Sequence, residues 1–98
     1  MFSHVVIFWT DPAIPTAADE LLAGTKMLKG IPGVQQLHSG KMAPSHRPVV
    51  DQTYQVGLNV IFTSKEAERE YQAHPIHLEF VEKYAKRLVK KLVVYDFE

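Results

Sequence analysis

The sequence contains no cysteine. That absence excludes disulfide bonds, thiolate-bound metals and cysteine nucleophiles, and it favours a reducing compartment, so we expect a cytoplasmic protein. An excess of charge is also missing, because 11 basic residues balance 11 acidic ones. Without a net field, neither nucleic acid nor an anionic membrane surface is an expected partner. The apolar N-terminus lacks basic residues, a cleavage site and the length to span a bilayer, and therefore predicts a strand.

The 98 residues, 46% of them hydrophobic, are sufficient for one domain over 1–98 with its own core. Runs of β-branched and aromatic residues, or strict alternation, predict strands at residues 4–9, 34–42, 52–62 and 92–97. Apolar residues at helical spacing predict one helix from Thr16 to just before Gly30. A second helical region starts after Thr63 or Ser64, and Thr63 with Glu66 has the form of a capping box. His74-Pro75 is expected to split that region into 64–73 and 75–89, because proline disfavours helical geometry at the preceding residue.

This order of strands and helices, β-α-β-β-α-β, is typical of an α+β ferredoxin-like fold with an antiparallel sheet and helices on one face. The other face needs a cover, since the first strand is apolar on both sides. Val5, Ile7 and Trp9 oppose the face that begins with His4. A large apolar patch rarely faces water, and the same face of a second copy would bury it. We therefore predict a homodimer.

Five features together carry a family likeness. They are His-Val-Val-Ile-Phe at 4–8, Ile-Pro-Gly at 31–33, Phe-Thr-Ser at 62–64, Tyr-Gln-Ala-His-Pro-Ile-His at 71–77 and Val-Tyr-Asp-Phe at 94–97. On these residues the chain resembles the stress-responsive dimeric A/B-barrel (Dabb) family over nearly its whole length, and Tyr-x-x-His-Pro-x-His is the most specific element. The resemblance implies ferredoxin-like protomers whose sheets pack face to face into a dimeric α/β barrel.

The resemblance also suggests an activity. One plant member of the family, olivetolic acid cyclase, closes a linear polyketide by aldol condensation. Its catalytic tyrosine and histidine correspond to Tyr71 and His77, and its first-strand histidine corresponds to His4. The aromatic residues that line the cyclase pocket from its first helix have no counterpart at 21–24, so this chain departs from the cyclase there.

The residue pattern independently places these groups together. His4 shares a strand face with apolar residues, and His77 shares a helix face with Val81, so both are expected between the sheet and the helices. Two imidazoles and a phenol in an apolar pocket can perform acid–base chemistry, with His77 as the base and Tyr71 polarising a carbonyl oxygen. The alternative is that they are partly buried polar groups with a structural role. The expected ligand-binding residues are Val6, Phe8, Leu58, Phe80 and Tyr84.

Three functions remain open on this basis. The first is a stress-related A/B-barrel protein of uncertain biochemical role that binds a small apolar or aromatic molecule. The second is a cofactor-independent, polyketide cyclase-like enzyme of the aldol type. A heme-handling or monooxygenase-like barrel is less favoured, since no proximal-ligand pattern is present. No metal or organic cofactor is expected, because Pro75 interrupts the helix between His74 and His77 and no glycine-rich nucleotide loop occurs.

Overall fold

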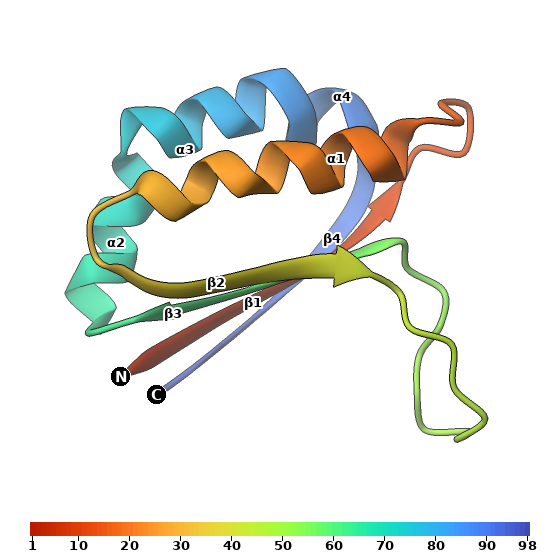
Figure 1. Ribbon diagram of the computed structural model, residues 1–98, viewed down its shortest axis with the longest axis horizontal. Coiled ribbons are helices and arrows are strands. Elements are labelled where there is room, and N and C mark those ends of the chain that lie inside the picture. Colours follow the sequence, from red (N-terminus) through yellow and green to blue (C-terminus); the bar gives the residue numbers. More distant parts are fainter.

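The computed structural model describes residues 1–98 and contains one four-stranded antiparallel sheet with the strand order β2-β3-β1-β4. All helices lie on one face of this sheet (Figure 1). The predicted ferredoxin-like arrangement is therefore confirmed. The elements, in chain order, are β1 (Phe2–Thr10), α1 (Ala17–Thr25), η1 (Lys26–Gly30), β2 (Val34–Lys41), β3 (Val56–Phe62), α2 (Lys65–Ala73), α3 (Pro75–Phe80), η2 (Val81–Ala85), α4 (Lys86–Leu88) and β4 (Val89–Phe97).

Strand β1 is central and pairs with β3 on one side and β4 on the other. His4 lies opposite Val60 on β3 and opposite Asp96 on β4. Side chains that oppose each other across an antiparallel pair lie on the same face of the sheet. The helix-covered face of β4 therefore carries the alternating residues that oppose His4, Val6 and Phe8.

The predicted boundaries of two strands were wrong. Strand β3 begins at Val56 instead of residue 52. Both the backbone N–H and the hydroxyl of Thr53 donate to Asp51 Oδ1, and such local bonds hold the backbone in a turn instead of a ladder. Strand β4 begins at Val89 instead of residue 92, because Val89 pairs with Thr10 beyond an irregularity in the register.

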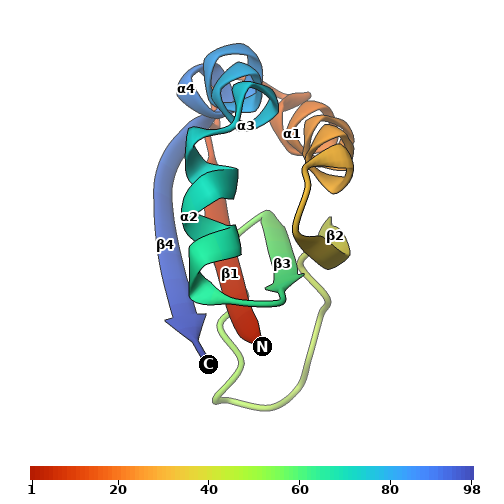
Figure 2. The same cartoon turned by 90° about the vertical axis from the view of Figure 1, so that its left-hand side faces the viewer.

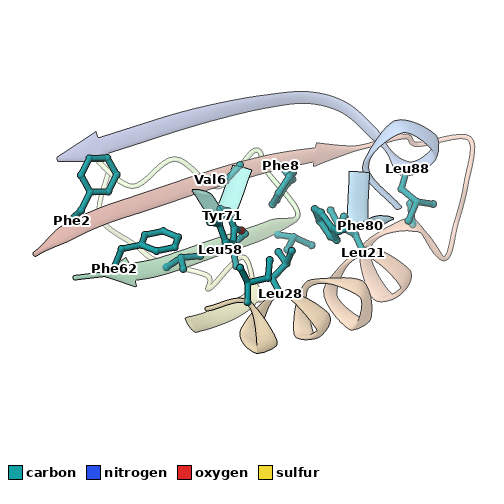
Figure 3. Packing of buried hydrophobic residues seen from close by; sticks show 14 residues of the cluster. Phe2, Val6, Phe8, Leu21, Leu28, Leu58, Phe62, Tyr71, Phe80 and Leu88 are labelled. Carbon is teal, nitrogen blue, oxygen red and sulfur yellow. The ribbon is translucent and has the colours of Figure 1, made fainter. Parts of the chain in front are cut away.

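The core lies between the sheet and the helices (Figure 3). Tyr71 on α2 packs edge to face on Phe62 of β3, with ring centroids 4.9 Å apart. Full burial of a side chain such as Leu or Phe stabilises a fold by about 1.5–3 kcal/mol, so this layer dominates stability. The buried hydrophobic residues are Phe2, Val6, Phe8, Ala17, Leu21, Leu28, Ile31, Val56, Leu58, Val60, Phe62, Tyr71, Phe80 and Leu88.

Two polar side chains determine where the second helical region starts and breaks. Ser64, and not Thr63, is the N-cap of α2, since its hydroxyl accepts the backbone N–H of Ala67 at 3.1 Å. The capping box predicted from Thr63 is therefore wrong. His74 leaves helical geometry with ψ 140°, and its Nδ1 accepts the N–H of Ile76 at 3.1 Å. With Pro75 as the first residue of α3, the predicted break is confirmed.

The opposite face of the sheet carries no helix. Figure 2, viewed along the sheet, shows α1, α3 and α4 on one side, and the loop between β2 and β3 extends away from them. Val5 and Ile7 are half-buried on this open face, and Tyr95 and Phe97 of β4 are exposed. An apolar surface of this kind is the one that the sequence predicts a second copy would cover.

Gly24 on α1 makes a testable contact with Tyr84 on η2. A Cβ at Gly24 would lie 2.6 Å from Cγ of the Tyr84 ring, a distance that real contacts do not reach. We expect Gly24→Ala to lower the free energy of unfolding by about 1–3 kcal/mol through overpacking. Gly30→Ala is the matched control, because no atom lies within 4 Å of its Cβ position. Equal stabilities of the two variants in urea denaturation would contradict the close approach.

Candidate functional site

A cavity of about 160 Å³ lies between the sheet and the helices. His4 from β1, Tyr71 from α2 and His77 from α3 all line it. The Tyr71 ring centroid is 5.9 Å from that of His4 and 4.9 Å from that of His77. The structure thus brings together the three residues that the sequence singled out. The remaining lining residues are Val6, Phe8, Leu58, Gln72, Phe80, Val81, Ala85, Leu92 and Val94.

Local structure explains why the three polar groups meet. The period of two along β1 directs His4 to the helix-covered face. Tyr71 is buried on the inward face of α2 and packs against β3. The break at His74-Pro75 then starts a new helix, and His77 lies in the first turn of that helix beside Tyr71. A single uninterrupted helix would continue the direction of α2, so the break is what places His77 at the cavity.

His4 is only 4% exposed and makes a short hydrogen bond. Its Nδ1–H donates to Asp96 Oδ1 at 2.6 Å. The carboxylate of Glu68, 14% exposed, lies 3.8 Å from the same nitrogen and accepts a hydrogen bond from the Gln72 amide at 2.7 Å. Because Nδ1 is engaged by Asp96, Nε2 is the nitrogen left for other contacts.

Neither acidic residue was predicted from the sequence, although each left a signal there. Asp96 lies directly opposite His4 in the β1–β4 register. That pairing follows from the ferredoxin-like topology once the two strands are aligned. Glu68 precedes Tyr71 by three residues on α2, a spacing that places two side chains on one helix face. Carboxylates near an imidazole fix the orientation of its ring.

Tyr71 contributes a neutral phenol. Burial raises the pKa of its hydroxyl well above the ordinary value, and the negative charge of Glu68 raises it further. The hydroxyl therefore keeps its proton at physiological pH. In that state it can donate a hydrogen bond to an oxygen atom bound in the cavity.

His77 is held in its neutral form. Burial lowers the pKa of its imidazole, and the neighbouring His4 lowers it further, while a backbone hydrogen bond at Gln72 and the charge of Glu68 oppose these effects. Its Nδ1 is buried and has no hydrogen-bond partner in the protein. Buried polar atoms without partners are rare and often mark functional positions.

Of the five residues expected to bind a ligand, four lie at the cavity. Val6, Phe8, Leu58 and Phe80 line the cavity. Tyr84 is the exception, because its ring packs against Gly24 and stacks on Phe80 at 6.0 Å. Tyr84 therefore packs against Phe80 and does not itself line the cavity.

No group of three or more histidine, aspartate or glutamate side chains is arranged to hold a metal ion. His74 uses its Nδ1 to cap α3. None of the helices is long and apolar enough to cross a membrane.

Residues 2–98 match the family described as Stress responsive A/B Barrel Domain (Dabb). The chain belongs to the Dabb family. A protein of Arabidopsis thaliana whose crystal structure is known is 30% identical, with a TM-score of 0.79 over 100% of this chain and 94% of that chain. A comparison with curated protein sequences gave no match.

Two further structures show the same fold at lower identity. A dimeric ferredoxin-like protein of unknown function from Jannaschia is 21% identical, with a TM-score of 0.79 over 99% of this Dabb chain and 97% of its own. Hydroxynitrile lyase from Passiflora edulis is 19% identical, with a TM-score of 0.76 over 98% and 90% of the two chains. At these identities the likeness extends to the fold alone.

The lowered pKa of His77 predicts how the stability of this Dabb domain depends on pH. The folded state binds a proton at His77 less readily than the unfolded state, whose histidine pKa is about 6.5. The free energy of unfolding is therefore undiminished above that pKa and decreases as pH falls from it through the lower pKa of the folded state. We expect the wild type to lose stability between about pH 7 and about pH 5 more steeply than His77→Leu does. Urea denaturation across that range measures the difference. His46→Leu, which removes an exposed imidazole, is the control, and parallel curves for wild type and His77→Leu would contradict the assignment.

Proposed function

We propose that this Dabb domain is a cofactor-independent enzyme that binds a small apolar carbonyl compound in the cavity and moves a proton at the carbon next to the carbonyl. The observation that carries the proposal is the meeting of His77, whose pKa is lowered by burial, and the protonated phenol of Tyr71 on one cavity. The absence of cysteine supports action in the cytoplasm.

Each group has a distinct part in the reaction. His77 accepts the proton from the α-carbon, and the electron pair of that C–H bond moves into an enolate. Tyr71 donates a hydrogen bond to the carbonyl oxygen, where the negative charge develops. The enolate then attacks a second carbonyl carbon in an aldol step, in which a C–C bond forms, the C=O π bond breaks and the resulting alkoxide takes the proton from His77. Alternatively, His77 returns the proton to the α-carbon. Proton transfer by a positioned side chain contributes about 10²–10⁴ in rate.

His4 and Asp96 support this pair. Asp96 fixes the orientation of the His4 ring, as a carboxylate does for an imidazole in other acid–base sites. The positive charge that His4 carries when protonated opposes protonation of His77 and helps to keep the base neutral. The resemblance to the polyketide cyclase assigns the same three positions, and the lyase from Passiflora edulis indicates that the fold supports an enzyme.

Ligand binding without catalysis is the second candidate. It is favoured by the apolar character of the cavity, since nine of its twelve lining residues are hydrophobic. Such a lining suits a small apolar or aromatic molecule held mainly by desolvation. In that case the polar groups would only orient the ligand.

Proton exchange tests the first candidate directly. Small ketones and β-dicarbonyl compounds are incubated with protein in deuterated water, and loss of the α-proton signal is followed by NMR. We expect His77→Ala to lower the exchange rate by about 10²-fold or more, and Tyr71→Phe to lower it by a smaller factor. His46→Ala, a change in an exposed loop, should keep the wild-type rate.

The outcomes separate the two candidates. Ligand-induced shifts at cavity residues without any catalysed exchange would favour binding alone. Circular dichroism and melting temperature verify that the variants remain folded. If His77→Ala loses exchange because it unfolds, His77→Gln replaces it, since glutamine keeps a polar side chain of similar size.

We further propose that two copies associate through the open sheet face. Val5 and Ile7 lie on it and line a hollow of about 210 Å³, which has His38 and Asn59 among its walls. Packing the same face of a second copy on it would bury these residues and close a barrel with a partly polar interior. The dimeric Jannaschia protein of the same fold supports this arrangement.

Ile7→Lys tests the dimer. A charge placed in the apolar centre of an interface is left unpaired and desolvated, so we expect the variant to sediment as a monomer or to unfold. Wild-type protein at micromolar concentration should have twice the chain mass in sedimentation equilibrium. Leu78→Lys changes an exposed leucine on the outer side of α3 and should retain the wild-type mass. A wild-type protein that sediments as a folded monomer would contradict the proposal.

A further inference from the structure

The cavity at His4, Tyr71 and His77 continues along β4. A second hollow, of about 270 Å³, lies between the start of β4 and the end of the helical region, and it shares Val81, Ala85 and Leu92 with the cavity. In Figure 2, α3 and α4 lie beside the part of the chain that enters β4. The two spaces are therefore adjacent, and together they are called the groove, with the acid–base groups at one end.

The floor of the groove is one face of β4. Leu92, Val94 and Asp96 alternate along this strand, and Asp96 faces His4, whereas Lys90 lies at the irregularity in the β1–β4 register and leaves the strand's regular alternation. At about 3.3 Å per residue, Lys90 lies roughly 20 Å from Asp96. Between them, Leu92 is 48% exposed and Val94 43% exposed, so the middle of the floor is apolar and uncovered.

The far end of the groove is positively charged. Lys86, Lys90 and Lys91 line it. Residues 83–91 contain five of the 11 basic residues of the chain and no acidic residue, although the chain as a whole is neutral. The charge is thus a local feature of this end of the groove.

The lysines already have partners, but these contacts are weak. Lys86 pairs with Glu82 on the same helical segment, and both side chains are largely exposed. Lys90 Nζ is 3.7 Å from Asp11 Oδ2, and Lys91 Nζ lies 4.5 Å from the centre of the Trp9 ring. Exposed pairs of this kind contribute roughly 0.2–1 kcal/mol, so an incoming anion can compete for Lys86 and Lys90.

We infer that the groove selects substrates in which an apolar chain links the reacting carbonyl to a negatively charged end group, which Lys86 and Lys90 hold. This inference rests on the proposed function, because it takes the His77 end as the place of reaction. The apolar floor suits the linking chain, and the charge at the far end complements the anion. Lys86 and Lys90 would be specificity-determining residues that do not touch the reacting atoms.

Decanoate and decanol probe the inference, since they have the same chain and differ in the charge at one end. Each is titrated into labelled protein, and backbone amide shifts give both the affinity and the location. We expect decanoate to bind roughly tenfold more tightly than decanol, with shifts from Leu92 to Lys86. In the double variant Lys86→Gln/Lys90→Gln that advantage should disappear, while decanol binding is unchanged. Added salt should also reduce it.

The double variant Lys29→Gln/Lys65→Gln is the matched control. It removes the same charge from exposed lysines that do not line the groove, and it should keep the wild-type preference. Equal affinity for decanoate and decanol, or an equal loss of the preference for decanoate in both double variants, overturns the inference. The proposed chemistry is tested separately by the proton-exchange assay. A groove-lysine variant that changes the sedimentation mass instead would assign this surface to an interface between copies. Selective decanoate binding with no catalysed exchange would overturn the enzymatic function and leave an anion-selective binding groove.

Discussion

The position of β1 between β3 and β4 is the constraint on which the rest of the protein depends. Strand β1 is hydrogen-bonded to a neighbour on both sides, which fixes its register. A slip by one residue would move every side chain of the strand to the opposite face of the sheet. One face of this strand supplies His4 to the cavity, and the other supplies Val5 and Ile7 to the open face. The candidate site and the candidate dimer surface are therefore two consequences of one register.

The two imidazoles at the cavity have different surroundings. His4 is hydrogen-bonded to Asp96 and lies near Glu68, so carboxylates surround it. His77 Nδ1 has no hydrogen-bond partner, and burial lowers the pKa of the His77 imidazole, which keeps it neutral. Sites that divide acid and base roles between similar groups commonly do so through such differences in environment. Here the difference arises because one imidazole belongs to a strand beside β4 and the other to the first turn of a helix.

Interruptions in the helical region shape the groove as much as the sheet does. The break at His74-Pro75 starts α3, whose His77 and Phe80 line the cavity, and the close contact of Tyr84 with Gly24 holds the following segment against α1. These two contacts leave the helix-covered side of Leu92 and Val94 open. A straight helix packed along the whole sheet would cover that strand face and remove the groove.

Features that depend on neighbours along the chain could be predicted without the structure. Alternation over 56–62 identified a strand with one buried face, and His74-Pro75 identified the helix break, because strand pleating and proline geometry act over a few residues. The sequence left the N-cap undecided, since Thr63 and Ser64 both carry a suitable hydroxyl and only the path of the backbone selects Ser64. Asp96 beside His4, Tyr84 against Gly24 and the lysines at the end of the groove were decided by the tertiary structure alone. Each of these brings together residues on different elements, and their proximity depends on strand order, register and helix packing, which no local pattern encodes.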